Sequence, residues 1–382
     1  MANVFQNLIT YRKDLSCPPF GQDGQTYNQK NFARPFLPST IPSTSSGDLR
    51  HLHTFGLEAD CQGIYKLKGW DDFKTLDPKI GKKALILGGG SNVAFVESFE
   101  GLVLLQETLG RHCLEKNGEG VIVRCGAGEN WHDLLMWTLA QGWCGLENLA
   151  LIPGTVGAAP IQNIGAYGRE LKDVLKAVHV WDRTLQCRKS FSREECRLAY
   201  RDSLFKTDPD RYCVMEVDLE LSLQPQLHLD YGDIRKTLES KNILQPTAMQ
   251  VAEAVCSIRK SKLPDPIELG NAGSFFKNPV VSQAQAQKLK ERFPAMVAYD
   301  TGDGSVKLAA GWLIDRLGWR GQRVGGMGVH ERQALVLVNH GNGRGRELLQ
   351  LARDIQESVR AEYGVELSVE VNLIDAKGRM AF

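Results

Sequence analysis

The sequence predicts an α+β protein built from several domains. Three observations lead to this fold class: strand patterns around a glycine turn near residues 84–105, a β-rich middle that holds an uncharged glycine-rich loop, and alternating helix and strand patterns after residue 247. The 382 residues, 42% of them hydrophobic, are enough for two or three domains. No internal repeat is present.

Charge and composition exclude several classes of protein. The chain has 46 Lys and Arg against 45 Asp and Glu, for a net charge of +1, so nothing favours a nucleic-acid partner. No apolar run reaches the roughly 20 residues of a membrane-spanning helix, and the start lacks a signal peptide. The nine cysteines are scattered singly, without zinc spacing. We therefore expect a cytoplasmic protein with reduced cysteines, no metal site, no nucleic-acid partner and no membrane partner.

The first third contains a leader and a glycine turn. Residues 1–48 are rich in Pro, Ser, Thr and Asn, which is typical of a flexible leader. Strand patterns at 84–87 and 102–105 flank Gly88-Gly89-Gly90-Ser91-Asn92. A Rossmann phosphate loop does not fit, because Val93 stands where the third glycine belongs and no helix pattern follows. The turn remains either an anion-binding nest or a plain hairpin turn.

The middle of the chain combines one helix, several strands and one unusual loop. Asn130 is a possible N-cap of a helix over 130–140, with Gly142 just past its end. Strands are expected at 177–182 and 213–221, around a charged helical stretch near 192–197. The loop 151–168 has no charge, four glycines and two prolines. Its backbone groups need partners, which a large flat cofactor or a buried crossover would provide.

After residue 247 the pattern is that of a separate α/β domain. The expected helices and strands alternate along the chain. Helices are expected at 249–262, 282–293, 307–318 and 346–364, the last ended by Gly364. Strands are expected to open at Ser274, to cover 334–340, and to run with alternating polarity over 365–374.

The segment GNAGSFFKNP, from Gly270 to Pro279, places one hydroxyl between flexible glycines and two aromatic rings. Gly270 and Gly273 allow the main chain to take positive φ or to approach a ligand closely, whereas Phe275 and Phe276 favour burial. Ser274 is thus a polar group held in an apolar place. A tight turn leading into a buried strand is the alternative interpretation. A serine hydrolase is excluded because G-x-S-x-G fails around Ser274.

Seven strings, found in one order between about Thr54 and Ile374, resemble those of the UDP-N-acetylenolpyruvoylglucosamine reductase family of flavoenzymes. They are GGGSN, LIPGTVGAAPIQNIGAYG, YRDSLFK, KLPDP, GNAGSFFKNP, KLAAGWLID and QALVLVN. Tyr231-Gly232-Asp233 makes the chain look like the type I subclass. The resemblance implies a three-domain FAD-binding fold of the vanillyl-alcohol-oxidase type. It divides the chain into a leader (1–48), FAD-binding subdomains (49–105 with 375–382, and 106–250) and an α/β substrate domain (251–374).

The resemblance also implies a reaction and the residues that carry it. NADPH would reduce bound FAD, the flavin would pass hydride to C3 of the enolpyruvyl ether, and the product would be UDP-N-acetylmuramate, a peptidoglycan precursor. Ser274 matches the proton donor to C2, while Arg201 and Glu370 match the residues that stabilise the enolate. The partners would be these small molecules, and we expect a monomer.

Binding residues carry over in the same way. Contacts to the nucleotide sugar match Tyr231, Lys262, Asn278 and Gln333. Contacts to FAD match Gly88, Gly89, Gly90, Ser91, Asn92, Ile152, Pro153, Gly154, Gly157, Ala158, Asn163, Gly165 and Ala166. The chain departs from the family at Ala158 or Ala159, where a small polar residue is usual, and at Asn372, where an arginine is common.

Other interpretations stay open on the sequence alone. Glu370 belongs to a polar alternation with Glu366, Ser368 and Asn372 that is typical of a solvated strand face. Arg201 next to Asp202 is more often part of a surface ion pair, and Tyr231 an ordinary turn aromatic. The rival functions are a flavin oxidase with the same cofactor fold acting on a small alcohol or phenol, and a non-catalytic nucleotide-sugar binding protein.

Overall fold

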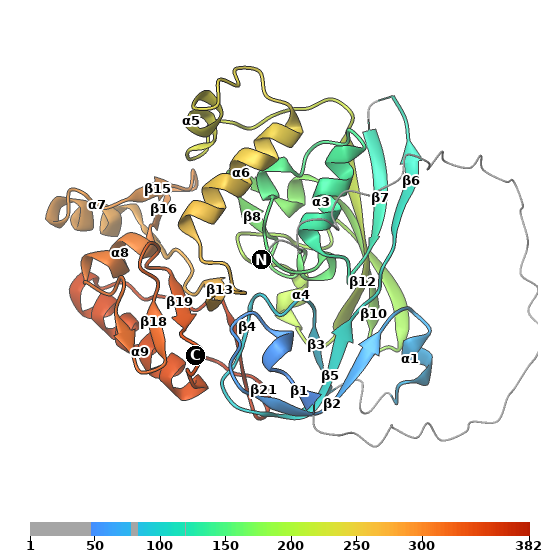
Figure 1. Ribbon diagram of the computed structural model, residues 1–382, viewed down its shortest axis with the longest axis horizontal. Helices are drawn as coiled ribbons and strands as arrows, with labels where there is room; N and C mark the ends of the chain where they lie inside the picture. Colours follow the sequence, from blue (N-terminus) through green and yellow to red (C-terminus); the bar gives the residue numbers. More distant parts are fainter. Residues whose placement is uncertain (1–46, 78–82, 119) are drawn as a thin grey trace, which may run out of the picture. The chain divides into compact units, whose positions relative to one another are not determined.

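The computed structural model describes residues 47–77, 83–118 and 120–382 (Figure 1). These residues belong to one compact unit. The expected leader lies outside the described residues except for Gly47–Asp48, which forms strand β1 and pairs antiparallel with β2 (Asp60–Leu67). The domain boundaries expected from the sequence stay a prediction.

The expected order of strand, glycine turn and strand is confirmed near the N-terminus. Strand β3 (Leu85–Leu87) ends at the turn, and β4 (Val93–Phe95) and β5 (Phe99–Gln106) follow without a helix. One sheet has the order β1-β2-β5-β3, with β2, β5 and β3 parallel. The short elements beside it are η1 (Arg50–Leu52) and α1 (Asp72–Thr75).

The C-terminal segment completes this region. Strand β20 (Asn372–Asp375) pairs parallel with β4, and β21 (Gly378–Arg379) pairs antiparallel with β20. The chain therefore returns at its far end to the strand that directly follows the glycine turn.

A long antiparallel sheet forms the β-rich middle, with the order β11-β10-β12-β7-β6. Its strands are β6 (Arg111–Lys116), β7 (Gly120–Gly126), β10 (Leu175–Asp182), β11 (Cys187–Ser192) and β12 (Tyr212–Ser222). The other elements are α3 (Trp131–Ala140), η2 (Glu147–Leu149), η3 (Val156–Ala158), β8 (Gly165–Ala166), β9 (Arg169–Glu170), η4 (Leu171–Asp173), α4 (Leu204–Thr207) and α5 (Ile234–Glu239). Side chains of this sheet, α3 and α6 (Ala248–Lys262) share one buried core.

Two sequence predictions in this region had different outcomes. The helix over 130–140 is confirmed, because the Asn130 side chain accepts a hydrogen bond from Asp133 N and Gly142 follows at φ 77°. The helix near 192–197 is wrong: β11 runs to Ser192, and the following residues make a single turn. Arg197 at φ 49° ends that turn in the left-handed region, so no second helical turn can form.

The last third is the α/β region coloured gold through orange to red in Figure 1, where α9 lies beside both β18 and α8. Its sheets have the orders β13-β19-β18-β17 and β14-β16-β15. The strands are β13 (Gly270–Ser274), β14 (Val280–Ser282), β15 (Ala298–Asp300), β16 (Ser305–Leu308), β17 (Arg323–Val324), β18 (Met327–Val329) and β19 (Val336–Asn339). The helices are α7 (Gln283–Arg292), α8 (Ala310–Arg316) and α9 (Gly345–Tyr363).

Boundaries in this region differ from expectation at three places. The strand near Ser274 ends there instead of opening, and a bulge between Asn271 and Ser274 interrupts its pairing with β19. Lys307 and Leu308 belong to β16, so α8 begins only at Ala310. Residues 365–371 alternate in burial as expected, yet regular pairing begins only at Asn372. The predicted end of α9 at Gly364, at φ 63°, is confirmed.

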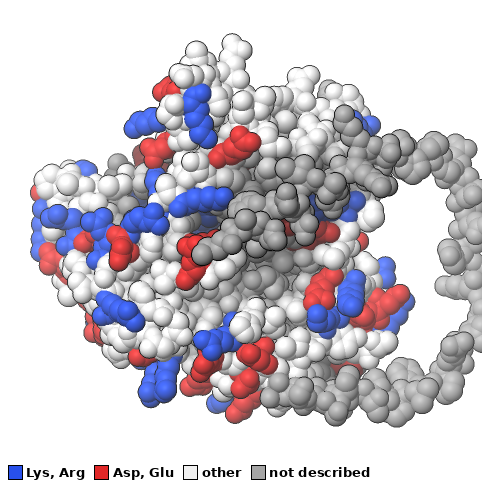
Figure 2. All heavy atoms as spheres, in the orientation of Figure 1, with Lys and Arg blue, Asp and Glu red and all other residues white. Residues whose placement is uncertain are grey.

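Surface and composition agree with a chain of balanced charge. Positive and negative side chains lie side by side over much of the face shown in Figure 2. None of the helices in the described residues is long and apolar enough to cross a membrane. The cysteines outside position 17 are unpaired, and those at 61, 125, 144, 196 and 213 are buried.

Candidate active site

The glycine turn and the long glycine-rich loop are built against each other. A Cβ added to Gly88 would lie 2.5 Å from Thr155 Oγ1, and one added to Gly89 would lie 3.1 Å from Gly154 Cα. The Ser91 hydroxyl donates a hydrogen bond to Pro153 O at 3.0 Å. Only glycine allows the two main chains to approach so closely. The two segments that the sequence singled out thus form one cradle, which we define as residues 88–92 and 151–162.

The loop is held in place by the start of α3 and the end of β7. Its amides at Val156 and Gly157 donate to Glu129 O and Ala127 O at 2.9 and 2.8 Å. Leu151, at φ 58°, donates its N–H to His132 Nδ1 at 3.1 Å. Burial lowers the pKa of His132, which suits an unprotonated accepting nitrogen. These three amides therefore have partners before any ligand binds.

Two pockets of about 140 and 90 Å³ adjoin the cradle. The residues that line both are Ile86, Gly88, Thr155, Ala158, Ile161 and Arg379. Lys206 lines the larger pocket, and with Arg379 it gives the pair of pockets two cationic side chains. Among the described residues that line them, none is acidic. This lining favours an anionic ligand.

The residues present fit the FAD that the resemblance implies. The Thr155 hydroxyl is buried and has no hydrogen-bond partner within the described part of the chain, although it lines both pockets. A buried hydroxyl of this kind needs a partner, which a ligand oxygen would supply. The glycines let the turn pack against the loop, and consecutive backbone N–H groups in such a turn can form a nest for an anion.

The predicted FAD contacts are distributed unevenly around these pockets. Those that line at least one pocket are Gly88, Gly89, Gly90, Ser91, Asn92, Ile152, Pro153, Gly157 and Ala158. Asn163, Gly165 and Ala166 line neither. The Asn163 amide donates to Glu170 Oε2 and Ala199 O, so its side chain holds the loop together. Gly154 also lines neither pocket, and contact of FAD with any of the predicted residues stays a prediction.

Arg201 and Glu370, which lie 169 residues apart, form an ion pair. Arg201 Nε donates to Glu370 Oε1 at 2.7 Å, and the two side chains are 21% and 12% exposed. Arg201 Nη2 also donates to Gly165 O at 3.1 Å. The solvated-face interpretation of Glu370 is therefore wrong, and so is the surface pair of Arg201 with Asp202. Because Glu370 accepts this hydrogen bond, a donor role for its carboxyl stays a prediction.

Ser274 lies on the backbone segment next to Glu370. The bulge in β13 contains Gly273 at φ 71°, whose N–H donates to Asn271 Oδ1 at 2.9 Å. Just beyond it, Glu370 N donates to Phe275 O at 2.8 Å. The predicted positive φ is confirmed at Gly273, whereas Gly270 lies close to the main chain at Phe55, 2.5 Å from its carbonyl oxygen to an added Cβ, so close approach to a ligand stays a prediction. Bulges of this kind are frequent beside active sites, where they change the direction of a side chain.

Lys206 connects the cradle with the Arg201–Glu370 pair. Its Nζ donates to Arg201 O at 2.8 Å and supports a residue held at φ 54°. Burial, and next the charge of Lys277, lower the pKa of Lys206 from 10.5 to about 8. Lys206 thus places a partly desolvated cation between the pocket and the ion pair.

The predicted substrate residues fall into two groups. Tyr231, 52% exposed, packs edge to face against Tyr167 at 6.4 Å, and Lys262 Nζ pairs with Asp233 Oδ2 at 2.8 Å. Asn278 and Gln333 line a separate cavity of about 320 Å³ beside α8. Their joint contact with one substrate stays a prediction.

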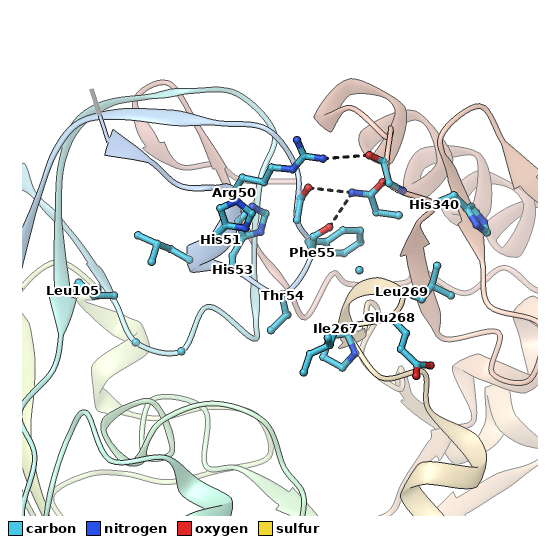
Figure 3. Close-up of a pocket in the computed structure, with 18 residues that line it drawn as sticks. Arg50, His51, His53, Thr54, Phe55, Leu105, Ile267, Glu268, Leu269 and His340 are labelled. Carbon is cyan, nitrogen blue, oxygen red and sulfur yellow. Dashed lines mark hydrogen bonds between the residues drawn. The ribbon is translucent and has the colours of Figure 1, made fainter. Parts of the chain in front are cut away.

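A cavity of about 690 Å³ lies elsewhere, between residues 50–56, 266–270 and 339–341 (Figure 3). Figure 3 shows the hydrogen bonds that bridge its walls, from Arg50 to Gly341 O and from Asn339 to Phe55 O and Gly56 O. Of the predicted site residues, Gly88 and Gly89 line it, whereas Ser274, Arg201 and Glu370 do not. The cavity is therefore distinct from the region where the predicted catalytic residues meet.

Three polar residues at the pockets were missed by the sequence analysis. Thr155 and Lys206 fall inside strings that carry the resemblance. The sequence therefore placed them near the predicted site but did not predict their roles. Arg379 lies outside those strings. Its position at the pockets follows only from the pairing of β21 with β20 and from the residues that line the pockets.

Comparisons with known proteins agree with this geometry. A family model described as UDP-N-acetylenolpyruvoylglucosamine reductase, C-terminal domain, matches residues 265–374, and one described as an FAD binding domain matches residues 79–185.

Relatives named UDP-N-acetylenolpyruvoylglucosamine reductase are similar over nearly their full lengths. That of Pseudomonas aeruginosa is 48% identical over 85% of this chain and 97% of its own. That of Pseudomonas putida is 50% identical over 87% and 99%. The crystal structure of UDP-N-acetylenolpyruvylglucosamine reductase (MurB) from Thermus caldophilus is 25% identical, with a TM-score of 0.59 over 86% of this chain and 98% of its own.

Proposed function

Because this chain belongs to the UDP-N-acetylenolpyruvoylglucosamine reductase family, we propose that Ser274, Arg201 and Glu370 carry the chemistry of its reaction. The protein is an FAD-containing oxidoreductase that reduces UDP-N-acetylenolpyruvoylglucosamine in peptidoglycan precursor synthesis. The observation that supports these roles is the Arg201–Glu370 ion pair. It lies next to Ser274 in the structure, because Glu370 N donates a hydrogen bond to the carbonyl oxygen of Phe275, the residue after Ser274.

Each of the three residues has a separate task in this proposal. Ser274 delivers a proton from its hydroxyl to C2 of the enolpyruvyl group, and it directly follows the bulge that contains Gly273. The Arg201 guanidinium provides fixed positive charge for the substrate carboxylate and the developing enolate. Glu370 orients Arg201 through their 2.7 Å contact. Lys206 keeps the Arg201 main chain in place.

FAD, when bound, supplies the two-electron redox chemistry. The cradle residues 88–92 and 151–162 would hold it, with Thr155 as one polar partner. NADPH is the proposed source of electrons. Tyr231, Lys262, Asn278 and Gln333 would hold the nucleotide sugar. We further propose that the protein is a cytoplasmic monomer. It has no nucleic-acid partner and no membrane partner in this proposal.

The test separates the two half-reactions of the full-length holoenzyme by stopped-flow absorbance. Ser274→Ala should leave flavin reduction by NADPH within about twofold, and should slow reoxidation by the enolpyruvyl substrate by roughly 100-fold or more. Ser368→Ala, an exposed serine whose backbone accepts from Lys277 N, is the matched control. Equal damage to both half-reactions would assign Ser274 a structural role.

A further inference from the structure

Arg379 is a cationic residue of the cofactor pockets that neither family match covers. The matches end at residues 185 and 374, whereas Arg379 lies on the C-terminal strand β21. Its side chain lines both pockets beside the cradle, together with Gly88, Thr155 and Ala158. Arg379 therefore stands where the two pockets adjoin.

The hairpin β20–β21 explains this position. Asp375 Oδ1 accepts hydrogen bonds from Lys377 N and Gly378 N at 2.8 and 3.0 Å, and Gly378 turns the chain at φ 126°. The turn sets Arg379 directly opposite Ile374. Residues opposite each other in an antiparallel pair share one face, and Ile374 lines the larger pocket. The strand register thus directs the guanidinium toward the cradle.

The charge of Arg379 has little to balance it. Its ion-pair partner is Asp210, at 3.7 Å, whose side chain is 68% exposed. Surrounding protein lowers the pKa of Arg379 by desolvation, although 30% of its side chain stays accessible. A second arginine, Arg183, lies near enough for the two positive charges to interact, which adds positive charge to this region. A guanidinium in such a place is suited to an anionic ligand with paired oxygens.

Resting on the proposed assignment of these pockets to FAD, we propose that Arg379 binds the diphosphate of the cofactor. The diphosphate is the anionic part of FAD, and the lining of the two pockets offers it no acidic neighbour among the described residues. The Thr155 hydroxyl, buried and unpartnered in that part of the chain, lines the same junction and would share this contact.

The experiment compares ligands with and without a diphosphate on the full-length chain freed of flavin. Dissociation constants for FAD, ADP and riboflavin are measured by fluorescence and calorimetry for the wild type, Arg379→Met and Arg379→Lys. Arg379→Met should raise the constants for FAD and ADP by about tenfold or more, and leave that for riboflavin unchanged. Arg379→Lys should recover part of the lost affinity, because lysine keeps the positive charge but not the paired N–H donors of the guanidinium.

Lys377→Met is the matched control, since it removes a cation from the same hairpin at an exposed position outside the pockets. It should leave all three constants unchanged. Salt should weaken FAD binding more for the wild type than for Arg379→Met. Unchanged FAD affinity in Arg379→Met, or equal loss for FAD and riboflavin, would overturn the proposal. A wild-type chain that binds no FAD would instead refute the assignment of the pockets to this cofactor.

Discussion

The cofactor cradle and the substrate face are built on opposite principles. The cradle, residues 88–92 and 151–162, is made of main chain whose close approaches leave no space for a Cβ at Gly88 or Gly90. The proposed substrate face, which we define as Tyr231 and Lys262, is made of long side chains, with Tyr231 half exposed and Lys262 paired with Asp233 on the surface. One region is thus set by the fold before a ligand arrives, and the other retains freedom to adjust.

This difference predicts how each region responds to mutation. A single methyl group added in the cradle displaces backbone, so its effect should reach both folding and cofactor content. A single side chain removed from the substrate face loses one contact, so its effect should stay within substrate affinity. Arg201 and Lys206 lie where the two regions meet, and should give intermediate effects.

The largest effect is expected for Gly90→Ala. Its Cβ would lie 2.0 Å from Leu52 O at a backbone φ of 61°, which we expect to cost at least about 3 kcal/mol of unfolding free energy and most of the bound FAD. Denaturant unfolding and flavin absorbance measure both.

Gly56→Ala is the matched control for this change. Gly56 has nearly the same φ of 63°, but no atom within 4 Å of an added Cβ, so about 1 kcal/mol of strain is expected alone. Similar losses of unfolding free energy for both variants would show that the close contacts around Gly90 do not make the cradle more sensitive to an added methyl group.

Arg201→Lys should have the next largest effect. A lysine cannot reach Glu370 and Gly165 O at once, so reoxidation by the enolpyruvyl substrate should slow about 100-fold while flavin content stays normal. Stopped-flow reoxidation and flavin absorbance are the measurements. Arg197→Lys changes an exposed arginine that is also left-handed, at φ 49°, and should have no such effect. A loss of flavin in Arg201→Lys would place Arg201 in the cradle instead.

Lys206→Met should change how stability depends on pH. The folded pKa of about 8 lies below the ordinary 10.5, so between these values the unfolded chain binds more protons than the folded one. Stability of the wild type relative to Lys206→Met should therefore rise as pH increases from about 8 to 10.5. Unfolding of the flavin-free chain by denaturant at several pH values measures this difference. Exposed Lys288→Met serves as the control, and a flat or falling difference would contradict the prediction.

The smallest effect is expected for Tyr231→Phe. The ring and its contact with Tyr167 remain, and only the hydroxyl is lost, so the dissociation constant of the nucleotide sugar should rise about threefold to tenfold. Flavin reduction by NADPH should change little. Titration of the oxidised enzyme with substrate measures the constant, and an unchanged value would remove Tyr231 from the substrate face.

Local features of the molecule were predictable from the sequence, and long-range ones were not. Asn130 caps α3 and Gly364 ends α9 because both signals act within a few residues. The approach of Arg201 to Glu370 depends on segments 169 residues apart, which no period or spacing encodes. The family resemblance predicted that both residues act at one site, and the structure shows the hydrogen bond between them.

The failed predictions have physical causes of the same kind. The charged stretch near 192–197 has side chains that suit a helix, yet the left-handed Arg197 stops the chain after one turn. The polar alternation around Glu370 correctly predicted an extended segment, but not that Glu370 turns away from solvent toward a cation. Arg379 had no local signal, because its position depends on how a short hairpin pairs with a distant strand.

The parallel pairing of β20 with β4 has a consequence for biosynthesis. Residues 93–95 leave the ribosome long before residues 372–374, with which they pair. The edge of β4 that pairs with β20 therefore stays open until almost the whole chain has been translated. Chains released early would lack the hairpin and hold flavin poorly, so the cofactor would mark chains whose synthesis has passed residue 379.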